Sequence, residues 1–398
     1  MIDYSSLLSG KVQEIKPSGI RKFSELAAEM GNVISLGVGE PDFQTPWAIR
    51  QAGIESLERG RTHYSPNAGF RELKQEIDRY LERRMGLSYS EEETMVTIGG
   101  SEAIDMMIRA VIDPGDEVLI PEPCYVSYDP IARLTGAKVV SIPTRFEDDF
   151  RLTAEALKAA ITPKSKLLIF PYPNNPTGGI MEREDLEAIA EVLRDTNILV
   201  LSDEIYAELT YGGKKHVSIA SIDGMWERTI VVNGFSKTYA MTGWRLGYAV
   251  GPAPLIREMI KIHQFAIMCA PTTSQLAAVE ALRSCDEEIE AMRDEYDMRG
   301  KYLVGELNRI GLECFQPQGA FYVFPSIRRT GLSSEEFCER LLREERVAVI
   351  PGSAFGGWGE GHIRISYCYS LQHLKIAVRK IEKFLKKLER EKHENGQG

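Results

Sequence analysis

The chain has 398 residues, which is enough for two domains with a substantial core. Its formal net charge of -10, with no basic stripe to offset it, argues against a nucleic-acid partner. No apolar run is long enough to span a bilayer, so we expect no membrane association, and the first residues lack the pattern of a signal peptide. The six cysteines are far apart and the six histidines have no metal-ligand spacing, which predicts a cytoplasmic protein with reduced thiols and no metal site.

The first two thirds of the chain predict an α/β fold. Residues 1–16 resemble an arm, and Pro17–Met30 has the apolar stripe of a helix. Between residues 46 and 285, short runs of aliphatic and β-branched residues alternate with helical periodicity. Such continuous apolar strands are typical of a mainly parallel sheet that is covered by helices on both faces. The predicted strands are Met95–Ile98, Lys166–Phe170, Ile198–Leu201 and Thr229–Val232.

The pattern changes after about residue 286. A long charged helix, Glu287–Ile310, comes before the segment Gly319-Ala-Phe-Tyr-Val-Phe324. A helix, a strand and a last helix, Leu371–Lys392, follow it. We interpret this part as a smaller α+β domain that the N-terminal segment completes. The predicted domains are therefore 1–45 (arm and part of the small domain), 46–285 (large domain) and 286–398 (small domain).

Lys237 follows the predicted strand Thr229–Val232 on a loop bracketed by glycines. A lysine in this position can form a Schiff base with an aldehyde, although a lone loop lysine is more often a plain surface residue. Ser236 and Arg245 on the same loop suit an anion such as a phosphate monoester. Pyridoxal 5′-phosphate (PLP) is an aldehyde that carries such a phosphate.

Polar groups also follow the other predicted strands, and ligands of open α/β sheets bind at the carboxyl ends of strands. Gly100, Ser101 and Glu102 open a helix whose free amides could bind an anion, or Ser101 could be an ordinary N-cap. Asn175 could face outward from a proline-fixed loop or could be a turn residue. Asp203 could meet a protonated pyridine nitrogen, cap the next helix or pair with an arginine. Together these are the parts that a PLP site needs.

The sequence resembles the class I aminotransferases, the fold-type I PLP enzymes related to aspartate aminotransferase. The resemblance extends from about Ile20 to the last helix, and it is strongest to the aromatic or broad-specificity and N-acetyl-diaminopimelate aminotransferases. Its motifs are Gly37-Val-Gly-Glu-Pro-Asp-Phe43, Tyr64-Ser-Pro-Asn-Ala-Gly69, Asn175-Pro-Thr-Gly178, Ser202-Asp-Glu-Ile-Tyr206, Ser236–Arg245 and His362-Ile-Arg-Ile-Ser366. It implies a large domain with a mostly parallel seven-stranded sheet and a small α+β domain.

The resemblance also implies a role for each matching residue. Lys237 is the Schiff-base lysine and proton shuttle, and Asp203 pairs with the ring nitrogen of PLP. Asn175 and Tyr206 bond its phenolic oxygen, and Tyr125 stacks on the ring. The phosphate is held by Ser101, Ser236, Arg245 and the amides near Gly100–Glu102, with Tyr64 from the neighbouring subunit of a homodimer. The α-carboxylate of the substrate is bound by Arg364, Asn175 and the backbone of Gly39. As simpler alternatives, Arg364 could pair with Glu360, Tyr125 could be core, and Tyr64 could be a surface turn residue.

The expected reaction transfers the amino group of an L-amino acid to a 2-oxo acid such as 2-oxoglutarate in two half-reactions. Ser101 replaces a lysine that often follows the glycine pair in relatives that favour aspartate, and Phe43, Tyr125, Tyr322 and Phe355 could line an apolar pocket. We therefore expect an aromatic or broadly hydrophobic donor.

Several alternatives stay open. The donor could be aspartate, alanine or N-acetyl-diaminopimelate, or the chain could be a carbon–sulfur β-lyase of the same fold. A nucleotide-binding oxidoreductase is disfavoured, because Asp42 replaces the third glycine of the dinucleotide motif beside Pro41.

Overall fold

The central element is a seven-stranded β-sheet, found in the computed structural model, which describes residues 2–17 and 19–395. Its strands are β2 (Thr94–Thr97), β3 (Glu117–Glu122), β4 (Lys138–Pro143), β5 (Ser165–Phe170), β6 (Leu199–Asp203), β7 (Thr229–Gly234) and β8 (Gly247–Val250). Their order in space is β2-β8-β7-β6-β5-β3-β4. β8 runs antiparallel to both of its neighbours, β2 and β7, and every other pairing in this sheet is parallel. The expected mostly parallel seven-stranded sheet is therefore confirmed.

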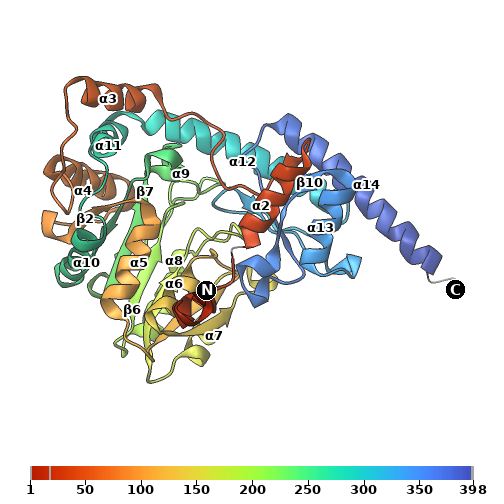
Figure 1. Ribbon diagram of the computed structural model, residues 1–398, viewed down its shortest axis with the longest axis horizontal. Coiled ribbons are helices and arrows are strands. Elements are labelled where there is room, and N and C mark those ends of the chain that lie inside the picture. The colour runs from red at the N-terminus through yellow and green to blue at the C-terminus, as the bar shows by residue number, and fades with distance from the viewer. Residues whose placement is uncertain (1, 18, 396–398) are drawn as a thin grey trace.

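Helices cover both faces of this sheet (Figure 1). Successive side chains of a strand point to opposite faces, so a strand that is apolar throughout is buried on both sides. In β3, Val118 packs in a cluster with α5 (Gly99–Val111) and α10 (Ala253–Ala266), whereas the adjacent Leu119 packs in a cluster with α8 (Arg183–Leu193). The other helices of this part are α3 (Trp47–Glu58), α4 (Arg71–Met85), α6 (Tyr128–Thr135), α7 (Ala154–Ala160), α9 (Phe235–Thr238) and α11 (Thr272–Ser284).

The second part of the molecule contains short strands and long helices. An antiparallel sheet has the order β11-β12-β9, and β1 pairs with β10 in parallel through Ile34 and Val347. This pairing brings the N-terminal segment against the C-terminal part of the chain, while the exact domain boundaries stay a prediction. The elements are β1 (Ile34–Ser35), β9 (Tyr322–Val323), β10 (Val347–Ala348), β11 (Ile350–Pro351), β12 (Ile363–Ser366), α2 (Gly19–Met30), α12 (Asp286–Arg309), α13 (Ser334–Glu345) and α14 (Leu371–Asn395).

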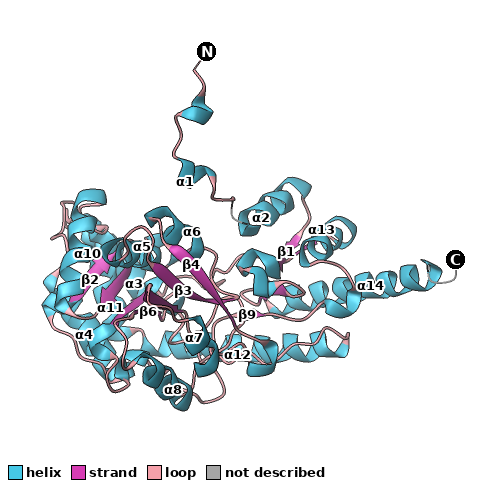
Figure 2. Cartoon of the chain, turned by 90° about the horizontal axis from the view of Figure 1, so that it is seen from below, coloured by secondary structure: helices cyan, strands magenta, loops and turns pink. Residues whose placement is uncertain are grey.

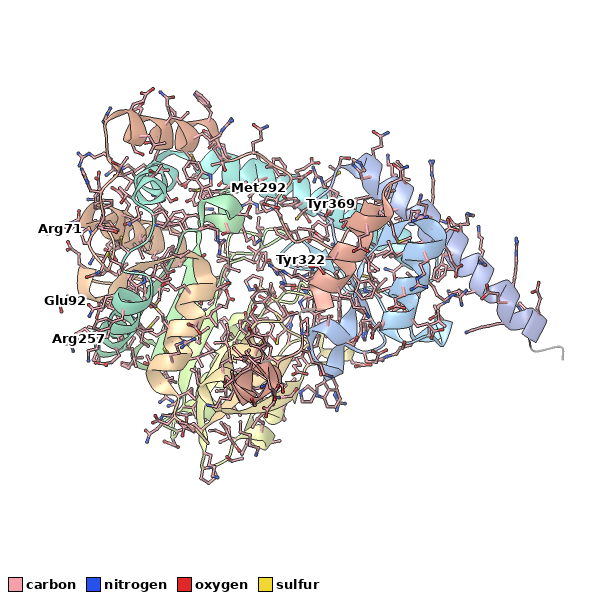
Figure 3. The ribbon with its side chains drawn as sticks, in the orientation of Figure 1. Arg71, Glu92, Arg257, Met292, Tyr322 and Tyr369 are labelled. Carbon is pink, nitrogen blue, oxygen red and sulfur yellow. The ribbon has the colours of Figure 1, made fainter. Side chains whose placement is uncertain are left out.

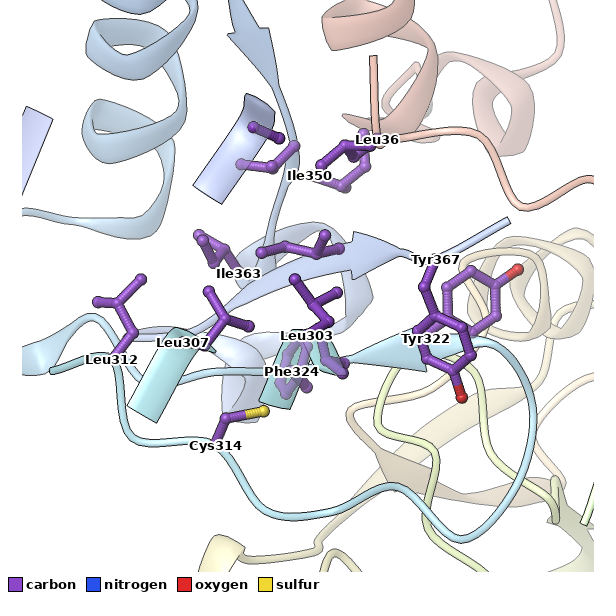
Figure 4. Close-up of a cluster of buried hydrophobic side chains, with 14 of the residues drawn as sticks. Leu36, Leu303, Leu307, Leu312, Cys314, Tyr322, Phe324, Ile350, Ile363 and Tyr367 are labelled. Carbon is purple, nitrogen blue, oxygen red and sulfur yellow. The ribbon is translucent and has the colours of Figure 1, made fainter. Parts of the chain in front are cut away.

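One apolar cluster fills this second part and reaches the boundary with the first. Ile350 lies in β11 and Leu36 directly follows β1, while Leu303 and Leu307 of α12 belong to the same cluster (Figure 4). The same cluster includes Tyr322, which lies where the two parts meet (Figure 3). Packing in this core therefore fixes the position of side chains that face the large sheet.

The terminal elements reach out from the central body. A short 3-10 helix (Tyr4–Ser6) stands off from it, whereas α1 (Gly10–Gln13) contacts α6, and α14 extends past the central body on another side (Figure 2). None of the helices in residues 2–17 and 19–395 combines the length and apolar character that crossing a membrane requires.

Candidate active site

A cavity of about 1410 Å³ opens between the two parts of the molecule, at the carboxyl ends of β5, β6 and β7. Ligands bind at this edge of open α/β sheets. Thirteen residues were predicted from the sequence to contact the cofactor or the substrate, and eleven of them line the cavity. They are Gly39, Gly100, Ser101, Tyr125, Asn175, Asp203, Tyr206, Ser236, Lys237, Arg245 and Arg364.

Lys237 lies in α9, directly after β7, with its amine at the wall of the cavity. Its Nζ donates a hydrogen bond to the carbonyl of Gly39 at 2.7 Å. Burial lowers the pKa of this amine to about 8, and the positive charges of Arg364 and Arg245 contribute in the same direction. Desolvation rather than neighbouring charge is therefore the main cause of the lowered pKa.

Asp203 ends β6 and is 8% exposed. Its Oδ2 accepts a hydrogen bond from the Tyr128 hydroxyl at 2.7 Å, and its Oδ1 accepts one from the backbone N–H of Ile205 at 3.2 Å. Burial raises the pKa of the carboxyl above its ordinary value, while the bond from Tyr128 opposes that shift. No salt bridge joins Asp203 to a basic residue within the described part of the chain, so it can accept a cationic group of a ligand.

Tyr128 is a functional residue that the sequence analysis missed. It lies at the start of α6, three residues after Tyr125, and the two rings meet edge to face at 5.6 Å. Tyr125 lies in the loop before α6, so no helical spacing links it to Tyr128. Only the fold reveals that its hydroxyl reaches Asp203 across 75 residues.

The start of α5 forms a glycine-rich turn beside Arg245. Gly99 has a φ of +71°, and a Cβ at this position would lie 2.9 Å from the guanidinium of Arg245. A side chain here would therefore be strained and would crowd the arginine. The backbone of Gly100 and Ser101 faces the cavity, next to Ser236. Free amides at a helix start together with a guanidinium suit an anion.

Arg364 is almost fully buried in β12 and does not pair with Glu360, whose carboxylate instead accepts hydrogen bonds from Ser334. Its Nη1 donates to Asn175 Oδ1 at 2.9 Å, and its Nη2 donates to the carbonyl of Gly37 at 2.5 Å. Its Nε has no partner among the described residues. The guanidinium carbon lies 4.5 Å from the ring centre of Tyr322 and 4.8 Å from that of Phe355, the range of cation–π contacts.

Gly39 leaves room for Tyr322. A Cβ on Gly39 would lie 1.8 Å from the Tyr322 hydroxyl, so no side chain fits there. The Tyr322 hydroxyl in turn is 2.9 Å from that of Tyr206, whose pKa is raised by burial. The segment that carries Gly37 and Gly39 therefore lies close against the cavity wall, with its carbonyls turned to Arg364 and Lys237.

Two selected residues lie elsewhere. The side chain of Glu102 turns away from the cavity and bonds Ile98 and His263, so only its backbone is near the predicted anion site. Tyr64 is 81% exposed and does not line the cavity. Phe43, expected in an apolar pocket, lines a neighbouring cavity that shares Thr242 and Arg245 with this one. Its ring packs edge to face on Tyr296 of α12 at 5.4 Å.

Comparisons with known proteins agree on one family. The family described as aminotransferase class I and II matches residues 31–381. The putative aminotransferase YugH of Bacillus subtilis (strain 168) is 52% identical over 96% of this chain and 99% of its own. An aspartate aminotransferase of Pyrococcus abyssi is 46% identical over 95% and 98%. The crystal structure of an aromatic aminotransferase from Pyrococcus horikoshii OT3 is 46% identical, with a TM-score of 0.88 over 92% of this chain and 99% of that one.

Proposed function

Because this chain belongs to the class I and II aminotransferases, which are PLP-dependent enzymes, we propose that it moves the amino group of an aromatic or broadly hydrophobic L-amino acid to a 2-oxo acid such as 2-oxoglutarate. The observation that carries this proposal is one cavity that contains a buried amine, a buried carboxylate and a buried guanidinium: Lys237, Asp203 and Arg364.

The residues of the cavity fit PLP. Asp203 is a buried carboxylate without a basic partner in the described chain, which suits a protonated ring nitrogen. The turn at Gly99–Ser101 with Ser236 and Arg245 suits the phosphate. Asn175 accepts from Arg364 through Oδ1, which leaves its Nδ2 free to donate to the phenolic oxygen together with Tyr206. When bound, the cofactor withdraws the electrons that remain after the α-proton leaves.

The protein's own groups then bind the substrate and move its proton. Arg364 binds the α-carboxylate, because a guanidinium held by two hydrogen bonds and two aromatic rings presents a fixed fork. Lys237 takes the α-proton as a neutral amine, and its pKa of about 8 makes that form accessible near neutral pH. Asp203 keeps the ring nitrogen protonated by its negative charge.

The donor preference rests on the aromatic wall of the cavity. Tyr125, Tyr322 and Phe355 line it, and Ser101 supplies no cation for a second carboxylate. The named relatives include both an aspartate and an aromatic aminotransferase, so the wall rather than the likeness supports this choice.

We also propose a cytoplasmic homodimer in which Tyr64 reaches the phosphate of the partner's cofactor. Tyr64 is 81% exposed, and large apolar side chains on α3 and at the end of α10 are also exposed, which a second copy of the chain would cover. Asn67 of the same loop donates to the Met268 carbonyl at 2.6 Å, which places this loop near the end of α10. The apolar residues are Trp47, Ile54, Leu57, Phe265, Ile267 and Met268.

The reaction can be tested in two halves. Mixed with an amino acid and no acceptor, the purified holoenzyme should release about one equivalent of 2-oxo acid per subunit and then stop. Continued turnover should require a second 2-oxo acid. Repeated release of pyruvate and ammonia from a cysteine conjugate without an acceptor would instead identify a carbon–sulfur lyase. A panel of donors, with phenylalanine, aspartate, alanine and N-acetyl-diaminopimelate compared by kcat/KM, then ranks the substrates.

A further inference from the structure

A buried carboxylate–imidazole pair lies behind the glycine turn that opens α5. Glu102, in the first turn of this helix, accepts a hydrogen bond from the backbone N–H of Ile98 at 2.5 Å through Oε2. Its Oε1 lies 2.7 Å from Nδ1 of His263. Because a carboxylate only accepts, the ring donates from Nδ1. Glu102 thus links the residue between β2 and α5 to a side chain of α10.

His263 has no other visible use. It lies on α10, is completely buried, and its Nε2 has no hydrogen-bond partner among the described residues. Burying an imidazole with one nitrogen left without a hydrogen bond lowers the stability of the fold. A histidine at such a position therefore suggests that the bond made by its other nitrogen has a role. Its one side-chain bond is to Glu102, so the role of His263 acts through that carboxylate.

The helix that carries His263 is itself fixed. α5 and α10 lie side by side (Figure 1) and share an apolar cluster. At the end of α10, the backbone N–H groups of Ile267 and Met268 both donate to the carbonyl of His263, and the Met268 carbonyl accepts from Asn67. The imidazole therefore projects from a helix that packs on α5 and is hydrogen-bonded at its end to the loop that carries Asn67.

The direction of the Glu102 side chain matters for an anion at the start of α5. A carboxylate in the first turn of a helix is attracted to the same free amides that bind a ligand anion, and its charge repels that anion. His263 holds the carboxylate on the far side of the turn, outside the cavity that Gly100 and Ser101 line. The bond to Ile98 also restrains the residue directly before Gly99, whose φ of +71° gives the turn its shape.

We propose that Glu102 and His263 are a positioning pair that keeps the Gly99–Ser101 turn open and correctly shaped for the phosphate of the cofactor. Neither side chain touches the ligand. The inference rests on the proposed placement of the phosphate at this turn, and it predicts that the pair contributes to binding only when the ligand carries a phosphate.

The experiment compares PLP with pyridoxal, which lacks the phosphate. Equilibrium dissociation constants of both are measured by fluorescence on full-length apoprotein of the wild type, His263→Ala and Glu102→Ala. Removing a buried hydrogen bond to a charged group corresponds to roughly tenfold or more in affinity. His263→Ala frees the carboxylate to compete with the phosphate, so this variant should bind PLP at least about tenfold more weakly. Glu102→Ala loses the bond to Ile98 but also removes the repelling charge, so it should lose less PLP affinity than His263→Ala. Both variants should bind pyridoxal like the wild type.

Met259→Ala is the matched control. Met259 is also fully buried on α10, one turn before His263, so its truncation destabilises the same helix without touching Glu102. Its affinity for PLP should stay near that of the wild type. Should His263→Ala fail to fold, His263→Phe keeps the ring volume but cannot donate to Glu102, and it carries the same expectation. The proposal would be overturned if removing His263 weakened PLP and pyridoxal binding equally, or weakened PLP binding no more than Met259→Ala does. A wild type that binds neither compound would instead refute the proposed function.

Discussion

The two walls of the cavity differ in how well they stabilise the charged forms of their side chains. On the sheet side, burial disfavours the charged form of both ionisable groups. It lowers the pKa of Lys237 to about 8 and raises the pKa of Asp203. On the opposite side, Arg364 receives two hydrogen-bond acceptors and two aromatic rings. A group whose charged form is destabilised by burial, such as Lys237 or Asp203, is suited to exchanging a proton or to pairing with a cation. A group whose charged form is stabilised by its neighbours, such as Arg364, is suited to binding an anionic substrate. The comparison therefore assigns chemistry to the sheet side and substrate recognition to the other.

The largest effect should come from removing the amine on the sheet side. Lys237→Ala should lower kcat by about 10⁴-fold or more, because both the covalent attachment and the proton transfer are lost. Steady-state kinetics of the purified variant measures this. Lys261→Ala, which removes an exposed lysine of α10, should keep wild-type activity. A Lys237→Ala enzyme whose kcat is within tenfold of the wild type would show that the sheet side of the cavity does not carry the reactive amine.

Two adjacent acidic residues allow a carboxylate that faces the cavity to be compared with one that serves the fold. Asp203 faces the cavity, while Glu204 is fully buried and bonded to Ser202, Ser218 and His216. Asp203→Asn should lower kcat/KM by roughly 10²- to 10³-fold with little change in stability, because the ring nitrogen loses its counter-charge.

Glu204→Gln should show the reverse behaviour. It should lower the free energy of unfolding by about 1–3 kcal/mol, since a buried hydrogen-bonded network is disturbed. Its kcat should change by less than tenfold. Kinetics and urea denaturation of both variants decide this, and similar kinetic losses in the two would contradict the assignment.

The cost of burying Lys237 should appear in the pH dependence of stability. Between pH 8 and 10.5 the folded state binds fewer protons at this residue than the unfolded state, so its contribution to stability rises with pH across this window. Below pH 8 the charged amine should destabilise the apoprotein by about 3 kcal/mol.

Lys237→Met isolates this contribution. At pH 7 the variant apoprotein should be more stable than the wild type, and the difference should shrink as the pH rises toward 10.5. Urea denaturation at several pH values measures the difference. A constant difference from pH 7 to 10.5 would mean that the pKa of the lysine is not lowered.

The binding side should respond in KM rather than in kcat. Arg364→Lys keeps the charge but loses the fork that bonds Asn175 and Gly37, so KM for every amino donor should rise about 10- to 100-fold. The effect should be equal for aromatic and aliphatic donors, because all carry the α-carboxylate. A variant that changes only the donor ranking would assign Arg364 to side-chain recognition instead.

The sequence located the parts of the site that follow directly from strand ends. Asp203 and Lys237 end or follow parallel strands, and the carboxyl ends of such strands meet at one edge. It could not reveal Tyr128 or the carbonyl of Gly37, because their contacts join segments far apart in the chain. Nor could it reveal that Phe43 lines a neighbouring cavity, where its ring packs on Tyr296 of a distant helix. For Glu102, sequence identified the helix start, but not the histidine that turns its side chain away.

The most direct test of the account is to locate the covalent link between protein and cofactor. Borohydride reduction of the PLP-loaded enzyme, followed by proteolysis and mass spectrometry, should add the mass of the reduced cofactor to the peptide that contains Lys237. The Lys237→Met protein treated in the same way should carry no label. Label on a different lysine of the wild type, or on none, would contradict the central role of Lys237.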